Sequence, residues 1–156
     1  MILIKHIKGN IFNSDADVIL HQVNCQGKMG SGVAKQVRDK YPWVYAEYRK
    51  LCEYAKNHGE PKSLLGINKV VYINENQQIA NLFAQEHYGY DGQLYTSYDA
   101  LRKCLKSINH QFKGKKVAIP YLMGCHRGGG DWKVVSKMIE ENLSDCDVTL
   151  YQFDGK

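Results

Sequence analysis

The chain reads HQVNCQGKMGSGVA over residues 21–34, directly after the apolar run Val18–Leu20 and directly before a segment with helical spacing. Glycine lets the backbone adopt positive φ angles and approach a ligand closely, and it stands here at Gly27, Gly30 and Gly32. The N–H groups that open the following helix then point at that ligand, and the helix dipole favours negative charge. The stretch predicts an anion-binding loop between a strand and a helix. A tight turn that merely needs glycine is the alternative.

A second glycine-rich loop, GCHRGGG over residues 124–130, has the same context, with an apolar strand before it and a helical run after it. The first loop has neither the Rossmann nor the Walker A spacing. An open α/β sheet places its ligand crevice at the carboxyl ends of its strands. The two loops are therefore expected to flank one crevice and hold a diphosphate from both sides. Arg127 would add a charged fork there, unless it is a surface side chain.

Strands and helices alternate along the chain. Apolar runs predict strands at 1–7, 17–23, 67–73, 77–83, 115–120 and 147–153. Helical spacing predicts helices at about 32–41, 42–55, 98–112 and 132–143. The strand at 17–23 is apolar at nearly every position, which is typical of burial on both faces. The expected fold class is α/β, with helices on both faces of a mixed, mainly parallel six-stranded sheet.

Size and composition favour a single domain over residues 1–156. The 156 residues are 44% hydrophobic and 24% charged, and the formal net charge of +5 tilts the chain toward anionic ligands. The basic residues are scattered, which is more typical of solvated helix faces than of a nucleic-acid surface. Five cysteines with no CxxC pair, no signal peptide and no membrane-length apolar run predict free thiols in a cytoplasmic protein. We expect a monomer with no membrane association, no cofactor and no metal.

Three polar residues near the loops are candidates for chemistry. Asn24 would hold a ribose hydroxyl or orient a water, with a turn-capping asparagine as the alternative. His21 has a side chain suited to proton transfer, with a buried structural histidine as the alternative. Asp131 would face the ligand, cap the following helix, or do both. Cys25 and Cys125 lack the arginine at the spacing that a thiolate phosphatase needs, so both are interpreted as small loop fillers.

The chain resembles the macro domain family over nearly its whole length. The resemblance rests on Lys8–Phe12, on His21-x-x-Asn24-Cys25 with the glycines that follow, on Ile119–Trp132 and on Leu150–Phe153. It is similar in particular to the branch that contains the yeast ADP-ribose-1″-phosphate phosphatase and related bacterial and phage proteins. The resemblance implies a three-layer α/β/α fold that binds ADP-ribose or ADP-ribose-1″-phosphate.

The resemblance also implies roles for particular positions. Asn10 and Ile11 would meet the adenine, beside Gly9, and Phe153, with Tyr151 as the alternative, would pack near it. Asn24 would contact the distal ribose, and His21 falls on the histidine assigned to catalysis in the phosphatase branch, with Asp131 as its acidic partner. The phosphates would lie against the two loops. The full set of implied loop contacts is Gly27, Met29, Gly30, Ser31, Gly32, Val33, Pro120, Met123, Gly124, Cys125, His126, Arg127, Gly128, Gly129 and Gly130.

These implications predict hydrolysis of the phosphate monoester of ADP-ribose-1″-phosphate. Three alternatives remain: a hydrolase that removes mono-ADP-ribose from protein or nucleic acid, a reader of ADP-ribosylated macromolecules without activity, and an RNA-binding domain that uses the net positive charge. The chain departs from the family at two places. Asn10 stands where many macro domains carry aspartate. The segment Ala84–His87 lacks the lysine of the terminal ADP-ribose hydrolase branch, which argues against a lysine-adduct mechanism.

Overall fold

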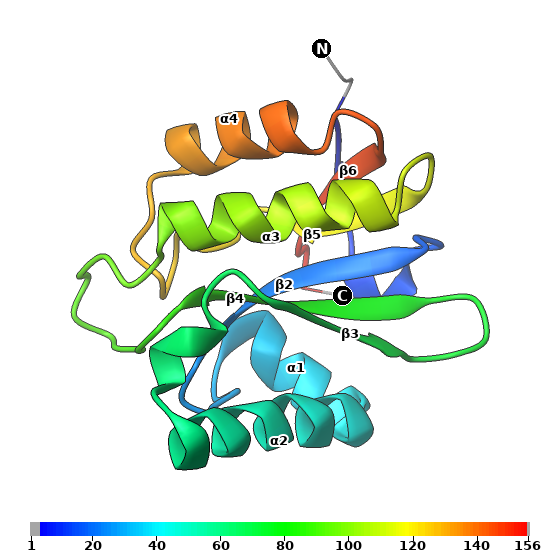
Figure 1. Ribbon diagram of the computed structural model, residues 1–156. Coiled ribbons are helices and arrows are strands. Elements are labelled where there is room, and N and C mark those ends of the chain that lie inside the picture. The colour runs from blue at the N-terminus through cyan, green and yellow to red at the C-terminus, as the bar shows by residue number, and fades with distance from the viewer. Residues whose placement is uncertain (1–3, 156) are drawn as a thin grey trace.

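The computed structural model describes residues 4–155 as one six-stranded sheet with helices on both faces (Figure 1). The strand order is β1-β6-β5-β2-β4-β3. The strands are β1 (Lys5–Lys8), β2 (Val18–Asn24), β3 (Asn68–Tyr72), β4 (Gln78–Gln85), β5 (Lys116–Pro120) and β6 (Asp147–Gln152). Only β3 runs antiparallel to its neighbour among these strands, so the predicted mixed, mainly parallel sheet is confirmed. Residues 1–3 of the predicted first strand lie outside the described residues.

Four helices form the outer layers: α1 (Gly32–Lys40), α2 (Pro42–His58), α3 (Tyr98–Gln111) and α4 (Trp132–Asn142). Figure 1 shows α1 and α2 on one face of the sheet and α3 and α4 on the other. Pro42 opens α2 at a position where its missing N–H costs nothing, and the Ser97 side chain caps α3 by accepting from Ala100 N. Two short 3-10 helices, η1 (Ile11–Asn13) and η2 (Pro61–Leu64), complete the elements. The predicted three-layer α/β/α fold is confirmed.

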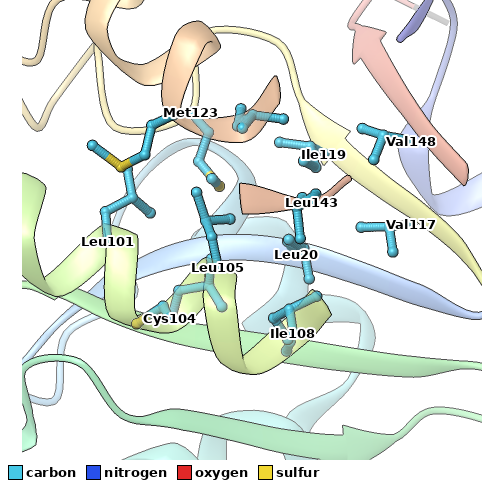
Figure 2. Packing of buried hydrophobic residues seen from close by; sticks show 14 of the residues in the cluster. Leu20, Leu101, Cys104, Leu105, Ile108, Val117, Ile119, Met123, Leu143 and Val148 are labelled. Atoms are coloured by element: carbon cyan, nitrogen blue, oxygen red, sulfur yellow. The ribbon is translucent and has the colours of Figure 1, made fainter. Parts of the chain in front are cut away.

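Each face of the sheet has its own hydrophobic core. Figure 2 shows Leu101, Leu105 and Ile108 of α3 packed with Leu20 of β2 and Ile119 of β5. On the other face, α1 and α2 cover side chains such as Ile19 and Phe83. Because β2 alternates its side chains between the two faces of the sheet, it is buried at nearly every position, as predicted. Full burial of one such aliphatic side chain contributes about 1.5–3 kcal/mol.

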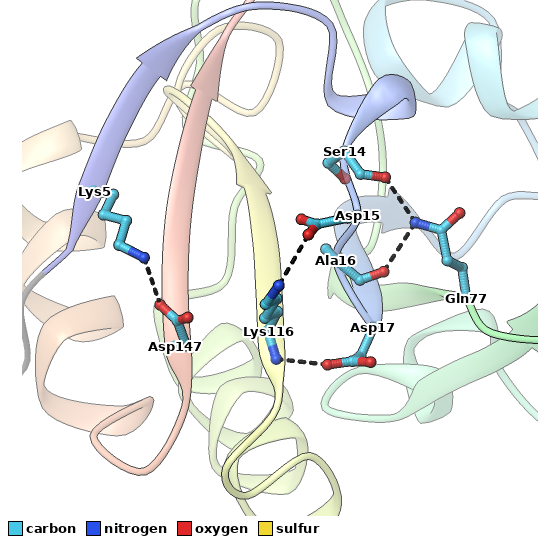
Figure 3. A network of polar contacts seen from close by, with 8 residues as sticks. All are labelled: Lys5, Ser14, Asp15, Ala16, Asp17, Gln77, Lys116 and Asp147. Atoms are coloured by element: carbon cyan, nitrogen blue, oxygen red, sulfur yellow. Dashed lines mark hydrogen bonds and ion pairs between the residues drawn. The ribbon is translucent and has the colours of Figure 1, made fainter.

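Polar side chains tie the amino ends of the strands together (Figure 3). Lys116, the first residue of β5, donates from Nζ to Asp15 Oδ2 at 2.9 Å and from its backbone N to Asp17 Oδ2 at 2.8 Å. Gln77 Nε2 donates to the carbonyl oxygens of residues 14 and 16. These exposed ion pairs contribute little to stability. These contacts join neighbouring segments at the amino ends of the strands. The carboxyl ends of the strands remain available for a ligand.

Within residues 4–155, the helices are all too short or too polar to cross a membrane.

Candidate functional site

A cavity of about 390 Å³ lies at the carboxyl ends of β2 and β5. Residues of both glycine-rich loops line it, among them Gly30, Gly32, Gly124 and Gly128. The two loops, about a hundred residues apart in sequence, therefore face one another across a shared space. The volume lies within the usual range for sites that take a small molecule.

The first loop ends at the open N-terminus of α1. Gly27 and Gly32 have φ angles of +81° and +60°, a region that side-chain-bearing residues rarely adopt. Ser31 is the N-cap of α1, but its side chain makes no capping hydrogen bond. The first N–H groups of an α-helix have no acceptor within the helix. Since Gly32 and Val33 also line the cavity, this helix start is placed to bind an anion there.

Tyrosine side chains of helix α2 hold the first loop in place by hydrogen bonds. The Tyr48 hydroxyl lies within 2.8 Å of the Asn24 carbonyl oxygen and 2.9 Å of Asn24 Oδ1. The Tyr48 ring is fully buried and stacks on Phe83, with ring centroids 5.5 Å apart. Burial raises the pKa of this phenol, so it stays protonated and acts as a donor. Tyr45 donates to the Gly27 carbonyl at 3.2 Å. The loop therefore rests on a rigid aromatic platform.

Of the two roles that the sequence left open for Asn24, the structure shows the turn cap. Its Oδ1 accepts from Gln26 N at 2.9 Å, and its Nδ2 donates to the Lys28 carbonyl at 2.8 Å, so the side chain fixes the turn. Asn24 also lines the cavity. An amide nitrogen carries two hydrogens, and one of them remains for a ligand.

The second loop is packed too tightly for any side chain at several positions. A Cβ on Gly128 would come within 2.6 Å of the Gly124 carbonyl oxygen, and one on Gly130 within 2.7 Å of the same atom. Gly129 has φ +69° and lies directly against the backbone of Gln93. Glycine is therefore required by close backbone approach as well as by φ.

The segment 88–96 contributes Tyr88, Gly89 and Tyr90 to the cavity wall, and the sequence analysis did not assign these residues to the site. The backbone N–H groups of Tyr95 and Thr96 donate to the Gly128 carbonyl at 2.8 and 2.9 Å, so this segment is bound to the second loop. The Arg127 guanidinium lies over the Tyr90 ring, 4.2 Å from its centroid. The clustering of tyrosine and glycine in this polar loop was the signal in the sequence.

Other lining residues that the sequence analysis did not assign to the site come from strand ends, from loops and from the first turn of α1. They are Gln22, Val23, Lys28, Ala34, Gln85, Tyr121 and Leu122. Leu122 has φ +65°, the only positive φ outside glycine among the described residues, and such local strain is common at ligand sites. Lys28 and Arg127 bring positive charge to the cavity, which suits an anionic ligand.

Gln22 lines the cavity, and its side-chain amide is held by neighbouring residues. Its Nε2 donates to Gln85 Oε1 and to Thr96 Oγ1, both at 2.8 Å, while the Thr96 hydroxyl itself donates to the Gly124 carbonyl. These partners fix the orientation of the amide. Gln22 Oε1 is consequently buried with no partner among the described residues. A hydroxyl or a water in the cavity would satisfy it.

His21 lines the same cavity and is almost fully buried, with 2% of its surface exposed. Its Nε2 lies 2.5 Å from Asn81 Oδ1, and its Nδ1 has no partner among the described residues. Burial lowers the pKa of this imidazole from 6.5 to about 4, because a charged ring would lose its hydration. The ring is therefore neutral at physiological pH and can accept a hydrogen bond.

The lowered pKa of His21 predicts an acid-sensitive fold. Below pH 6.5 the unfolded chain binds a proton that the folded chain refuses, so the free energy of unfolding falls as the pH drops from 6.5 to about 4. The loss over that window is about 3 kcal/mol. Urea unfolding at about pH 7 and about pH 4.5 measures it, with His21→Gln as the comparison. An equally steep loss in His21→Gln would contradict the assignment.

Asp131 lies outside the cavity lining. It is exposed, and its Oδ1 accepts from Lys133 N at 2.9 Å, so it is the N-cap of α4. Of its two predicted roles the structure shows the cap and does not bring the carboxylate to the cavity. In the sequence, an aspartate between a loop and a helix has the same pattern whether it caps the helix or faces a ligand.

The residues expected near adenine follow β1 and β6 at the same edge of the sheet, yet they do not line the cavity. Asn10 Oδ1 accepts from Phe12 N at 2.9 Å and caps η1, and Ile11 is buried in the core. Phe153 is 62% exposed. Residues of the two loops that likewise lie outside the lining are Gly27, Met29, Cys125, Gly129 and Gly130. They support the loops and do not face the space between them.

The two loop cysteines are not reactive thiolates. Burial raises the pKa of Cys25 to about 12 and that of Cys125 to about 11. A thiol with so high a pKa is a poor nucleophile at neutral pH. Their interpretation as loop fillers agrees with these surroundings.

No family model matches the chain. The chain is 28% identical to an ADP-ribose 1''-phosphate phosphatase of Saccharomyces cerevisiae, over 96% of this chain and 98% of that protein. It is 27% identical to a DNA ADP-ribosyl glycohydrolase of Mycobacterium tuberculosis, over 98% of this chain. The chain spans only 43% of the length of that relative.

Among solved structures, the macrodomain of Mycobacterium tuberculosis DarG superposes with a TM-score of 0.74 at 24% identity, over 96% of this chain and 97% of that one. The layers, the sheet and the facing glycine-rich loops described above agree with this likeness. The chain therefore has the macro domain fold.

Proposed function

We propose that the protein binds ADP-ribose and hydrolyses the phosphate monoester of ADP-ribose-1″-phosphate. The observation that carries the proposal is the pair of glycine-rich loops facing one another across one cavity, with the neutral His21 in its wall. The similarity to the yeast phosphatase over nearly the whole of both chains supports it.

The cavity supplies what a diphosphate needs. The start of α1 offers free N–H groups from one side, and the second loop offers a backbone held open by glycine from the other. Lys28 and Arg127 add positive charge. The acceptor Gln22 Oε1 and the remaining N–H of Asn24 suit the hydroxyls of a ribose.

His21 would act as the general base. A water oxygen attacks the phosphorus as the bond from phosphorus to the ribose oxygen breaks, and His21 Nδ1 accepts the proton of that water. A bound phosphate dianion favours the protonated imidazole, which offsets part of the effect of burial on its pKa. Asp131 is not given a role, because its side chain caps α4 outside the cavity.

A second candidate function is removal of mono-ADP-ribose from a macromolecule. The match to DNA ADP-ribosyl glycohydrolase along 98% of this chain favours it, and the exposed Tyr90 beside Arg127 would contact such a macromolecule. The segment Ala84–His87, at the end of β4, contains no lysine, so a lysine adduct is not available there.

The experiment compares binding and turnover in one preparation. Calorimetry should show one ADP-ribose bound per chain and weaker binding of AMP, which lacks the second phosphate and the distal ribose. ADP-ribose-1″-phosphate should then release inorganic phosphate. ADP-ribosylated oligonucleotide and ADP-ribosylated protein are tested alongside for release of free ADP-ribose. Release from either, with no phosphate release, would replace the phosphatase by the second candidate. Binding without any turnover would make the protein a reader, and no ADP-ribose binding would overturn the proposal.

A further inference from the structure

His21 and Asn81 form a buried polar pair between two central strands. They are register partners in the parallel pairing of β2 with β4. Asn81 is fully buried and His21 nearly so. Their neighbours Ile19, Val23, Ile79 and Phe83 belong to the hydrophobic core under α1 and α2. A polar pair in such surroundings must satisfy its hydrogen bonds internally or lose stability.

The orientation of the Asn81 amide is determined by a third group. Asn81 Nδ2 donates to the Lys69 carbonyl on β3 at 2.9 Å, and a carbonyl can only accept. Oδ1 is therefore the atom that faces His21 Nε2, 2.5 Å away. Since Oδ1 is also only an acceptor, Nε2 must carry the hydrogen.

The tautomer of the ring follows from this chain of donors. A neutral imidazole has one N–H, so a hydrogen on Nε2 leaves Nδ1 as a lone-pair acceptor. Nδ1 is buried and has no partner among the described residues, although the ring lines the cavity. A pair that served only to hold the sheet would gain nothing from an acceptor left open, which costs about 1–3 kcal/mol. The open acceptor points to a group that arrives with the ligand.

We propose that Asn81 is a positioning residue that locks His21 in the Nε2–H tautomer, so that Nδ1 accepts a proton or hydrogen bond from the group bound in the cavity. The proposal rests on the proposed function for the chemistry that Nδ1 performs. The tautomer itself does not depend on which reaction the protein catalyses. Asn81 acts through His21 and does not touch the substrate.

The tautomer is measured directly by nitrogen-15 NMR of the histidine ring, which distinguishes a protonated from an unprotonated ring nitrogen. The His21 signals are identified by their loss in His21→Gln. In the unmodified protein at neutral pH we expect hydrogen on Nε2 and none on Nδ1, with the Nδ1 signal shifting when ADP-ribose is added. Hydrogen on Nδ1 would overturn the proposal without any variant. This readout stands even if no phosphate is released, so it separates this proposal from the proposed function.

Variants then test the role of Asn81. Asn81→Leu removes the acceptor, and we expect a mixture of tautomers together with a fall in kcat on the order of a hundredfold, while ADP-ribose affinity changes little. Asn81→Asp restores an acceptor at Oδ1 and should recover the Nε2–H tautomer. Asn68→Ala is the matched control, because Asn68 lies on the neighbouring strand, donates to the Cys104 carbonyl and makes no bond to His21. An unchanged tautomer in a folded Asn81→Leu would overturn the role of Asn81. If that variant does not fold, Asn81→Ser is measured in its place.

Discussion

Replacing His21 by alanine is expected to slow phosphate release from ADP-ribose-1″-phosphate by about two to four orders of magnitude, which is the usual cost of removing an acid–base group. ADP-ribose should still bind, because the loops and the start of α1 do not depend on the imidazole. The effect therefore falls on kcat, and calorimetry with ADP-ribose should give nearly the affinity of the unmodified protein.

The physical reason is the position of the ring. Among the described histidines, His21 combines a place in the cavity wall with a neutral, nearly fully buried ring whose Nδ1 has no partner in that part of the chain. His126 also lines the cavity, but it lies on the second loop. His110, in the last turn of α3, provides a control that removes an imidazole far from the cavity. His110→Ala should leave the rate unchanged.

Loss of His21 also opens a small void and leaves Asn81 Oδ1 without its partner, so some loss of stability is expected. Melting curves and circular dichroism establish that the variant is folded before its rate is interpreted. A folded His21→Ala protein that still releases phosphate at the original rate would remove His21 from the mechanism. The binding proposal, which depends on the loops, would be unaffected.

Most of the fold is predictable from the sequence because the periodic segments are long and their ends are marked by residues that favour turns or helix starts. The apolar run before Asn24, the proline at position 42 and the run of glycines at 128–130 each mark one boundary, and each boundary lies within a few residues of the observed one. Strands that alternate with helices also predict a mainly parallel sheet. The two loops then lie opposite one another, because each follows a parallel strand and the carboxyl ends of parallel strands lie at the same end of the sheet.

The remaining features depend on contacts between distant segments. The segment 88–96 is held by backbone hydrogen bonds to Gly128, and backbone bonds leave no trace in side-chain patterns. The pairing of His21 with Asn81 depends on the register of β2 against β4. Asn10 was assigned to adenine by resemblance, but a three-residue 3-10 helix has no periodic pattern that would reveal it as a cap. For Asp131, likewise, its position between a loop and a helix does not distinguish a helix cap from a ligand contact.

The second large effect is expected at Gly129. In Gly129→Ala the new Cβ would overlap the carbonyl group of Gln93, which is backbone and cannot rotate away. The segment 93–96 must then move off the second loop and give up the bonds from Tyr95 N and Thr96 N to the Gly128 carbonyl. Arg127 and Tyr90 lose their mutual contact at the same time. We expect ADP-ribose affinity to fall by about tenfold or more, equivalent to about 1.4 kcal/mol.

A matched control separates this overlap from backbone strain. Gly129 has φ +69°, and Gly114, in the turn before β5, has φ +76° with no atom within 4 Å of an added Cβ. Alanine at either position carries the cost of a positive φ, on the order of 1–3 kcal/mol. Only at Gly129 does it also displace a neighbouring segment. Gly114→Ala should therefore lower the melting temperature while calorimetry with ADP-ribose gives the original affinity. Gly129→Ala should lower both the melting temperature and the affinity for ADP-ribose. Equal affinities in the two variants would mean that residues 88–96 are not part of the binding site, because the ligand would then be insensitive to the displacement of this segment from the second loop.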